Sequence, residues 1–264
     1  MSDPTPWALI LGASSGFGGA TSRALAKAGM NVIGVHFDMK STRHLADAVK
    51  ADVEAAGREA LFFNKNAAGD EHRADILNAV GERFQDGEHT VRVLMHSIAF
   101  GTLKPYFAAE ERDRLNRKNF DMTLDVMANC LVYWAQDLTG RGMMTRGGRI
   151  FAMTSAGGSR VARAYGAVSA AKAAIESHVR QMALELAPQG ISANSIQAGV
   201  TDTPALRKIP GSDAMLERAT ALNPTGRLTT PEIVADSIVQ FCHPALEFMT
   251  GNVIRVDGGE DIVM

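Results

Sequence analysis

The chain has 264 residues, with a hydrophobic fraction of 46%, a charged fraction of 21% and a net charge of −2. These values describe a globular protein with a large core, and they give no broad attraction to nucleic acid or to an anionic membrane. Its two cysteines, Cys130 and Cys242, have no metal-ligand spacing. So few cysteines are typical of a reduced cytoplasmic protein. We predict no membrane span and no signal peptide, since no apolar run reaches ~18 residues and the N-terminus lacks a basic segment.

The first recognisable unit is a strand, a glycine-rich loop, a helix and a second strand. Trp7 to Leu11 is a continuous apolar run, as expected of a buried parallel strand. The loop GASSGFG follows at 12–18, then a helical segment at 20–29 and a second strand at 31–35. A unit of this kind, ~30 residues long, is the context in which a glycine loop binds a dinucleotide. A plain tight turn is the other interpretation.

The glycines of this loop have distinct expected roles. Gly12 allows the tight exit from the strand, and Gly16 lets backbone amides approach a pyrophosphate. Gly18 allows the helix to pack close to the sheet. The predicted cofactor-binding residues of the loop are Gly12, Ser14, Ser15, Gly16, Phe17 and Gly18.

The end of the second strand bears on the choice of cofactor. An acidic residue at this point would bind the ribose 2′-hydroxyl of NAD, but the chain has His36 there. Lys40 and Arg43 could face a 2′-phosphate, whereas Asp38 would oppose it. Each of these residues is also explained as loop surface. We predict NADPH as the cofactor, with NADH as the alternative.

Strands and helices continue to alternate along the rest of the chain. Helices are predicted at 43–56, 71–84, 119–138, 164–187 and 231–241, the last with Thr229 or Thr230 as its N-cap. Strands are predicted at 60–64, 90–95, 149–154, 192–196 and 252–256. The alternation predicts one α/β domain over 1–264, a doubly wound parallel sheet of the Rossmann type with helices on both faces. The segment 204–227 is rich in proline, glycine and charge, and we predict an irregular, mobile substrate lid near 201–227.

Small and polar residues follow two of these strands, where the carboxyl edge of a parallel sheet forms its ligand site. Asn66 follows the third strand and could meet the edge of an adenine, although a turn asparagine is the other interpretation. After the fourth strand, the small residues let the chain pass close to a nicotinamide ribose. The residues predicted to do so are Ser97, Ile98 and Ala99.

The stretch from Thr154 to Lys172 places a hydroxyl at Ser155, a phenol at Tyr165 and an ammonium group at Lys172. Tyr165 and Lys172 are seven residues apart on a predicted helix, so they share one face, roughly 10 Å apart along its axis. A phenol beside a fixed cation is suited to donating a proton, because the cation lowers the phenol pKa. The alternative interpretation is that Tyr165 is an interfacial residue and Lys172 a surface residue of an amphipathic helix.

Together with this stretch, GASSGFG, NSIQAG at 194–199 and VDGG at 256–259 resemble the short-chain dehydrogenase/reductase family over about residues 7–259. The common pattern of that family places a tyrosine four residues before the lysine, where this chain has Val168. Its tyrosine lies seven before, which resembles the enoyl-acyl-carrier-protein reductase branch.

Further matches and departures narrow the resemblance. HSIAF at 96–100 and the pair Ala198-Gly199 are similar to that branch. Many of its members have a spread-out glycine pattern and a second tyrosine ten residues before the first, whereas this chain has the compact loop and Ser155. An NADPH-using subgroup has both of these features. The family's usual helix asparagine is replaced by Met127, with Asn129 nearby, which argues against a ketone-type proton relay.

The resemblance implies that the chain reduces the carbon–carbon double bond of a trans-2-enoyl thioester, on acyl carrier protein or coenzyme A, in fatty acid synthesis. Tyr165 would hydrogen-bond the thioester oxygen as it gains charge, and Lys172 would hold the nicotinamide ribose and lower the Tyr165 pKa. Ser155 would touch the substrate or only the surroundings of Tyr165. The residues expected to hold the carboxamide and pyrophosphate are Gly199, Val200 and Thr203. No metal site is predicted.

Other functions stay open at this point. A carbonyl reductase or alcohol dehydrogenase would use Tyr165 from a shifted position, and a polyketide-type enoyl reductase would differ only in its acyl group. An inert cofactor-binding protein is the alternative outside enzymology. The resemblance implies a homotetramer through helices at 119–138 and 164–187. Four cations flank the expected entrance and could meet an acidic carrier protein or a coenzyme A phosphate, or be ordinary surface charge: Arg160, Arg163, Arg207 and Lys208.

Overall fold

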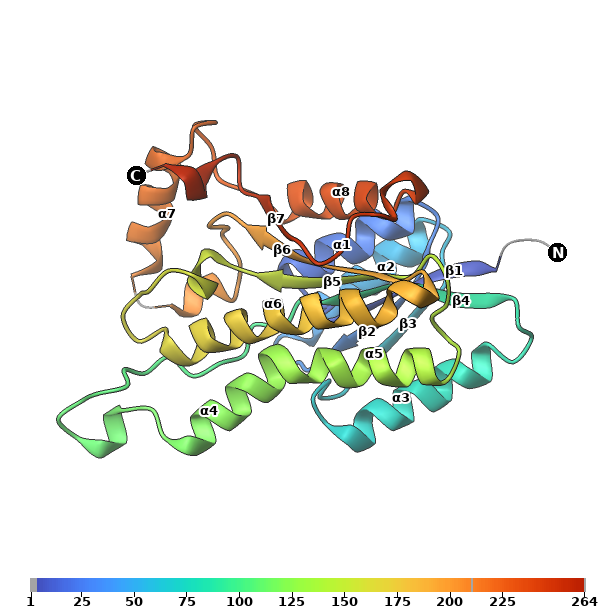
Figure 1. Ribbon diagram of the computed structural model, residues 1–264, viewed down its shortest axis with the longest axis horizontal. Helices are drawn as coiled ribbons and strands as arrows, with labels where there is room; N and C mark the ends of the chain where they lie inside the picture. Colours follow the sequence, from blue (N-terminus) through green and yellow to red (C-terminus); the bar gives the residue numbers. More distant parts are fainter. Residues whose placement is uncertain (1–3, 210, 264) are drawn as a thin grey trace.

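Seven parallel strands form one twisted sheet with helices on both faces (Figure 1). The computed structural model describes residues 4–209 and 211–263. The strand order is β3-β2-β1-β4-β5-β6-β7, so the order reverses between β1 and β4. The strands are β1 (Thr5–Leu11), β2 (Asn31–His36), β3 (Ala60–Asn64), β4 (His89–His96), β5 (Arg149–Thr154), β6 (Ser192–Ala198) and β7 (Val253–Val256).

Two layers of helices cover the sheet. One face carries α1, α2 and α8, and the other carries α3, α5 and α6 (Figure 1). A π-helical segment, Asp125–Asn129, joins α4 to α5. The helices are α1 (Gly16–Lys27), α2 (Arg43–Ala55), α3 (Asp70–Arg83), α4 (Arg117–Leu124), α5 (Cys130–Gly140), α6 (Gly166–Leu186), α7 (Ser212–Leu222) and α8 (Pro231–Phe241).

The central strand β1 shows why its sequence is apolar at every position. Trp7 and Leu9 point into the core beneath α3, α5 and α6, while Ala8 and Ile10 point into the core beneath α1, α2 and α8. A strand buried on both faces has no reason to alternate apolar and polar residues. The same holds for β2 and β5, in which every residue is buried.

The predicted fold class is confirmed, and every predicted strand and helix is present. The strands predicted at 60–64 and 149–154 and the helix at 231–241 have the predicted bounds. Thr230, not Thr229, caps α8, because its hydroxyl accepts a hydrogen bond from the Ile233 amide at 3.3 Å. No helix in the described ranges has the length and apolarity needed to cross a membrane.

Three details of the sequence prediction are wrong. The segment 204–227 is not irregular throughout, because α7 occupies half of it; Leu216 and Ala219 are buried, one helical turn apart. Because proline and glycine residues flank α7, the helical spacing of its apolar residues was not recognised in the sequence. The helix predicted at 119–138 is broken by the π-helical segment, and it begins earlier, at the capping box of Asn116 and Asn119. Helix α1 begins at Gly16 rather than at 20.

A stability measurement can test the close packing at the start of α1. A Cβ atom on Gly18 would lie 2.1 Å from the carbonyl oxygen of Gly12. Because that oxygen belongs to the backbone, it cannot move away without displacing the loop. We expect Gly18→Ala to lower the free energy of unfolding by ~1–3 kcal/mol in urea denaturation. Gly140→Ala on α5 is the control, since a Cβ there meets nothing within 4 Å. Equal effects of the two substitutions would contradict the packing described.

Candidate active site

The loops that follow β1, β4, β5 and β6 meet at the carboxyl edge of the sheet. Backbone hydrogen bonds hold two of these loops against neighbouring strands: the Gly12 amide donates to Val35 O of β2 at 2.8 Å, and the Ser97 amide donates to Leu11 O of β1 at 2.8 Å. A Cβ on Gly12 would lie 2.4 Å from the Ser97 carbonyl oxygen. The glycine loop and the segment from Ser97 to Ala99 are therefore held side by side, as the sequence predicted for one ligand site.

The glycine loop also faces the turn after β6. Gly16 has a φ of +53° and opens α1, and a Cβ there would lie 3.6 Å from the Thr203 methyl carbon. The turn after β6 therefore packs against the start of α1, where free amides and the helix dipole favour an anion. A pyrophosphate bound there would meet residues of both segments. The half-buried side chains of the same loop are Ser14, Ser15 and Phe17.

The end of β2 carries a compact polar network. His36 is buried, and its Nδ1 lies 2.9 Å from Asp38 Oδ2. The Asp38 backbone amide donates to Asn64 Oδ1, and Asn64 Nδ2 donates back to the Asp38 carbonyl, at 2.9 and 3.0 Å. Asn64 was not singled out from the sequence, because the contact joins residues 26 apart in the chain.

Three predicted contacts of an adenosine group lie near this network. Lys40 and Arg43 are exposed, and neither forms an ion pair within the described ranges. Asn66 accepts a hydrogen bond from the Ala68 amide at 3.1 Å. Its carbonyl oxygen thus serves the turn, and only its amide group is left for a ligand.

Lys172 lies on α6 with 6% of its surface exposed. Its ammonium group donates to the Met153 carbonyl oxygen at 2.7 Å. Burial lowers the pKa of Lys172 to about 8, although Glu176, one turn further along the helix, favours the charged form. The ammonium group remains protonated at neutral pH, but it is held there at a cost in stability.

Tyr165 stands immediately before α6, and the backbone that leads to it is strained. Ala164 has a φ of +59°, the one left-handed non-glycine residue in the described part of the chain. Such conformations cluster at functional sites. The Tyr165 ring packs over Gly157, where a Cβ would lie 2.6 Å from its Cε1. Ser155 Oγ is buried nearby and has no hydrogen-bond partner among the described residues.

The pKa of Tyr165 moves in the direction opposite to our prediction. Burial raises it, and the neighbouring Ser155 hydroxyl offsets part of the rise. Lys172 was expected to lower this pKa, but burial dominates, and the group that opposes burial is Ser155. The expectation is wrong because shared position on one helix face does not remove the cost of ionising a phenol in an apolar setting.

An apolar cluster fills the space beneath Tyr165. Val168 is buried and packs with Met127 and Ala171. Gly101 lets the loop after β4 touch the same cluster, since a Cβ there would lie 2.7 Å from Val168 Cγ2. Val168, four residues before Lys172, and Met127, at the position of the family's usual asparagine, therefore offer no polar group to the site.

His96 is a site residue that sequence reasoning missed, although it begins the HSIAF motif. It is fully buried at the end of β4, and its Nε2 lies 3.0 Å from the Val126 carbonyl oxygen. That carbonyl belongs to the π-helical segment, where backbone groups are freed from the regular ladder. Burial, and then the charge of Lys172, lower the pKa of His96 to about 4. His96 is therefore neutral at physiological pH, directly beneath the site.

The turn after β6 is held in place by Glu260 of the C-terminal segment, a contact that the sequence did not predict. The Val200 amide donates to both carboxylate oxygens of Glu260, at 3.2 and 3.1 Å. Thr201 Oγ1 donates to the Gly199 carbonyl at 2.9 Å. Burial raises the pKa of Glu260, and its hydrogen bond with Val200 opposes this rise. The backbone amide of Val200 is thus engaged by Glu260, and its carbonyl is the backbone group left for the predicted contact with a carboxamide.

A family model described as "Enoyl-(Acyl carrier protein) reductase" matches residues 12–260. The chain belongs to the short-chain dehydrogenase/reductase family, in the branch that this model describes. It is therefore an oxidoreductase that uses a nicotinamide cofactor.

Curated relatives within the family differ in their reactions. The 1-cyclohexenylcarbonyl-CoA reductase of Streptomyces collinus is 30% identical over 97% of this chain and 86% of its own length. The NADH-dependent enoyl-acyl-carrier-protein reductase of Aquifex aeolicus is 33% identical, over 65% of this chain and 62% of its own length. A 3-oxoacyl-acyl-carrier-protein reductase of Synechocystis is 28% identical over 96% of this chain and 95% of its own. Membership of the family therefore does not determine whether the protein reduces a carbon–carbon or a carbon–oxygen double bond.

Solved structures of family members have the same fold. The crystal structure of the Aquifex aeolicus enoyl-acyl-carrier-protein reductase aligns with a TM-score of 0.83 and 25% identity, over 98% of both chains. A short-chain dehydrogenase/reductase from Serratia marcescens aligns with a TM-score of 0.82 and 22% identity, over 97% of this chain and 98% of its own. The parallel seven-stranded sheet is therefore that of the family.

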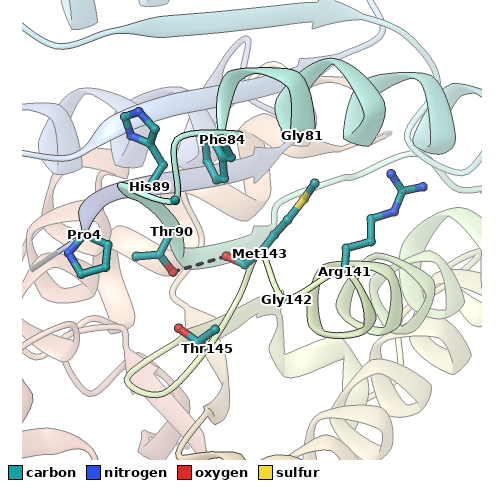
Figure 2. A pocket seen from close by; sticks show the side chains of 10 residues that line it. Pro4, Gly81, Phe84, His89, Thr90, Arg141, Gly142, Met143 and Thr145 are labelled. Atoms are coloured by element: carbon teal, nitrogen blue, oxygen red, sulfur yellow. Dashed lines mark hydrogen bonds between the residues drawn. The ribbon is translucent and has the colours of Figure 1, made fainter.

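Two cavities lie at opposite edges of the sheet. The larger, of about 430 Å³, opens between the starts of β1 and β4 and the loop after α5. Figure 2 shows Phe84, Thr90 and Met143 in its wall, with the Thr90 hydroxyl bonded to the Met143 carbonyl. No residue singled out from the sequence lines it. The second, of about 320 Å³, begins at Ala156, next to Ser155, and continues between the turn after β6 and α7. It adjoins the catalytic edge.

Replacing Lys172 tests the cost of its burial. Because burial lowers the pKa of Lys172 below its unfolded value, the unfolded state binds more protons between pH 8 and 10.5, and stability rises with pH in that window. We expect Lys172→Met to raise the free energy of unfolding at pH 7 by ~3 kcal/mol, at ~1.4 kcal/mol per pKa unit, while weakening cofactor binding. The gain shrinks as pH rises towards 10. Lys27→Met, at the exposed end of α1, is the control. A loss of stability at pH 7 would contradict this account.

Proposed function

We propose that this protein reduces the carbon–carbon double bond of a trans-2-enoyl thioester with NADPH, in fatty acid synthesis or a related acyl pathway. The observation that carries the proposal is the position of the phenol. Tyr165 lies seven residues before Lys172, and the position four before is filled by Val168 in an apolar cluster. No polar relay leads away from the site there, so the geometry favours stabilising an oxygen over protonating an alkoxide.

Tyr165 acts as the hydrogen-bond donor to the thioester oxygen. Its raised pKa keeps the phenol protonated at neutral pH, so the proton is available as charge develops on that oxygen. Ser155, whose buried hydroxyl adjoins the phenol and lowers its pKa, is the second polar group proposed to act at this point. Lys172 binds the nicotinamide ribose, and its charge favours the developing enolate.

The reaction balances with one hydride and one proton. NADPH supplies the hydride, which adds to the β-carbon of the enoyl group, and the cofactor is oxidised to NADP⁺. The α-carbon of the resulting enolate then takes a proton from solvent water, Tyr165 keeps its own proton, and the saturated thioester leaves. His96 is neutral at this pH and the neighbouring cluster is apolar, so neither supplies that proton.

A ketone reductase is the second candidate, because a 3-oxoacyl-acyl-carrier-protein reductase is among the relatives. This alternative needs a proton path for a full alkoxide. Met127 occupies the position where such enzymes have an asparagine, and it packs on Val168. The apolar cluster therefore favours the enoyl reductase.

NADPH is proposed in preference to NADH on the charges beyond β2. The Asp38 carboxylate would repel a 2′-phosphate, but it is paired with His36 and largely buried. Lys40 and Arg43, by contrast, are exposed and free of ion pairs in the described ranges. A 2′-phosphate would thus meet two available cations. The NADH named for the Aquifex aeolicus relative marks the alternative.

The lid and the carrier contacts are proposed around α7. Segment 201–227, which contains α7, closes the second cavity and is proposed as the lid over the acyl group. Two of the four entrance cations are engaged, since Arg160 pairs with Asp261, and Arg207 pairs with Asp202 and Asp213. The cations left for a carrier or coenzyme A phosphate are Arg163 and Lys208. A homotetramer is proposed on family membership.

Removing the Tyr165 hydroxyl tests the donor role. We expect Tyr165→Phe to lower kcat for crotonyl-CoA by roughly 10²–10³-fold, the effect of losing one donor to a developing oxyanion. The dissociation constant for NADPH should stay within about twofold, because the phenol is assigned to the substrate. Tyr133→Phe on α5 removes a hydroxyl from a surface ring and should change neither value. Unchanged turnover of Tyr165→Phe would refute the role.

Removing the two free cations tests the choice of cofactor. We expect Lys40→Ala with Arg43→Ala to weaken NADPH binding by about tenfold or more, because charge-assisted hydrogen bonds to a phosphate contribute ~1.5–3 kcal/mol each. NADH affinity should change little. Lys50→Ala removes the same charge from α2, where Lys50 pairs with Glu54 at 3.7 Å, and serves as the control. Equal losses for NADPH and NADH would show that neither cation meets a 2′-phosphate.

A further inference from the structure

The second cavity contains one buried polar side chain that the proposed chemistry does not use. Gln197 lies on β6 with 5% of its surface exposed, and its side chain lines the cavity. In the described part of the chain its amide group forms no hydrogen bond. The side chains of its two neighbours across the sheet do have partners: Thr154 donates to Glu176, and Arg255 pairs with Asp261. Only Gln197 presents both a donor and an acceptor to the cavity.

The charged groups around the same cavity are mostly engaged elsewhere. Glu260 accepts from the Val200 amide, and Asp257 accepts from the amides of Gly259 and Asp261. Arg160 pairs with Asp261 at 3.0 Å, so neither charge is free. Arg218 stands exposed at the rim. The Gln197 amide is therefore the uncharged polar side chain of the cavity interior, beside the Asp261 carboxylate, whose Oδ1 pairs with Arg160 but accepts no hydrogen bond from the described residues.

The remaining wall is apolar. Helix α7 contributes Met215 and Leu222, and the turn after β6 and the C-terminal segment contribute Val200 and Val263. A volume of about 320 Å³ has room for roughly ten water-sized groups at ~30 Å³ each. The cavity thus suits a compact carbon skeleton that carries one hydrogen-bonding group.

We propose that this cavity receives the distal end of the acyl group and that Gln197 binds a hydroxyl group on it. The preferred substrate is then a compact enoyl thioester with a distal hydroxyl, rather than an unsubstituted alkyl chain. A hydroxyl both donates and accepts, so it satisfies both ends of the amide, whereas a methyl group leaves them buried without partners. This inference rests on the proposed function, because it concerns the acyl group of that reaction.

The test compares two thioesters that differ only in one group. In 7-hydroxy-trans-2-heptenoyl-CoA a hydroxyl replaces the terminal methyl of trans-2-octenoyl-CoA, with the same number of heavy atoms. We expect the natural protein to favour the hydroxyl substrate in kcat/KM by about tenfold or more, since leaving a buried polar group unpaired costs ~1–3 kcal/mol. Gln197→Met keeps the length of the side chain without its polar atoms and should reverse the preference. The same ratio in both proteins would overturn the inference.

A binding measurement separates this inference from the proposed function. The saturated thioesters, 7-hydroxyheptanoyl-CoA and octanoyl-CoA, are titrated into each protein with NADP⁺ present. If neither enoyl substrate is reduced, the proposed function fails, and the ratio of the two dissociation constants still decides the role of Gln197. A ratio that shifts at least tenfold between the natural protein and Gln197→Met supports it, and a constant ratio refutes it. An unchanged NADP⁺ affinity shows that the variant is folded.

Discussion

A lysine buried at the carboxyl edge of the sheet is the constraint on which the site depends. The ammonium group of Lys172 has one protein acceptor, the Met153 carbonyl, and burial pulls its pKa towards neutrality. Burial, and then the charge of Lys172, lower the pKa of His96 and keep it neutral, and the adjoining cluster around Val168 is apolar. A buried charge held without a carboxylate in contact reduces stability. Such a cost is understandable where a ligand completes the site.

Contacts between distant segments hold the loops around this lysine. A Cβ on Gly12 would meet the Ser97 carbonyl of the loop after β4, and a Cβ on Gly18 would meet the Gly12 carbonyl, so neither position has room for a side chain. On the other side, Glu260 fixes the Val200 amide, and Arg160 ties the loop that carries Ser155 to the C-terminal segment. The glycine loop, Tyr165 and the second cavity thus lie at the same carboxyl edge of the sheet.

The sequence predicts the fold well because its signals are local. The apolar run of β1 and the Pro231 start of α8 are set by neighbouring residues. The site is less predictable, since His96 and Glu260 act through partners 30 and 60 positions away. Helix α7 was not predicted, because its apolar residues repeat over a short stretch that is flanked by proline and glycine. The pKa direction of Tyr165 was wrong, since helix spacing indicates which residues share a face and not how deeply they are buried.

The central claim is that the arrangement of Tyr165, Lys172 and Val168 directs reduction to a carbon–carbon bond. The most direct measurement is a competition: equal amounts of crotonyl-CoA and acetoacetyl-CoA are mixed with the purified protein and NADPH deuterated at both C4 positions. Mass spectrometry and NMR then locate the label. The account predicts butyryl-CoA with one deuterium on its β-carbon. Label found mainly in 3-hydroxybutyryl-CoA, at its carbinol carbon, would contradict it.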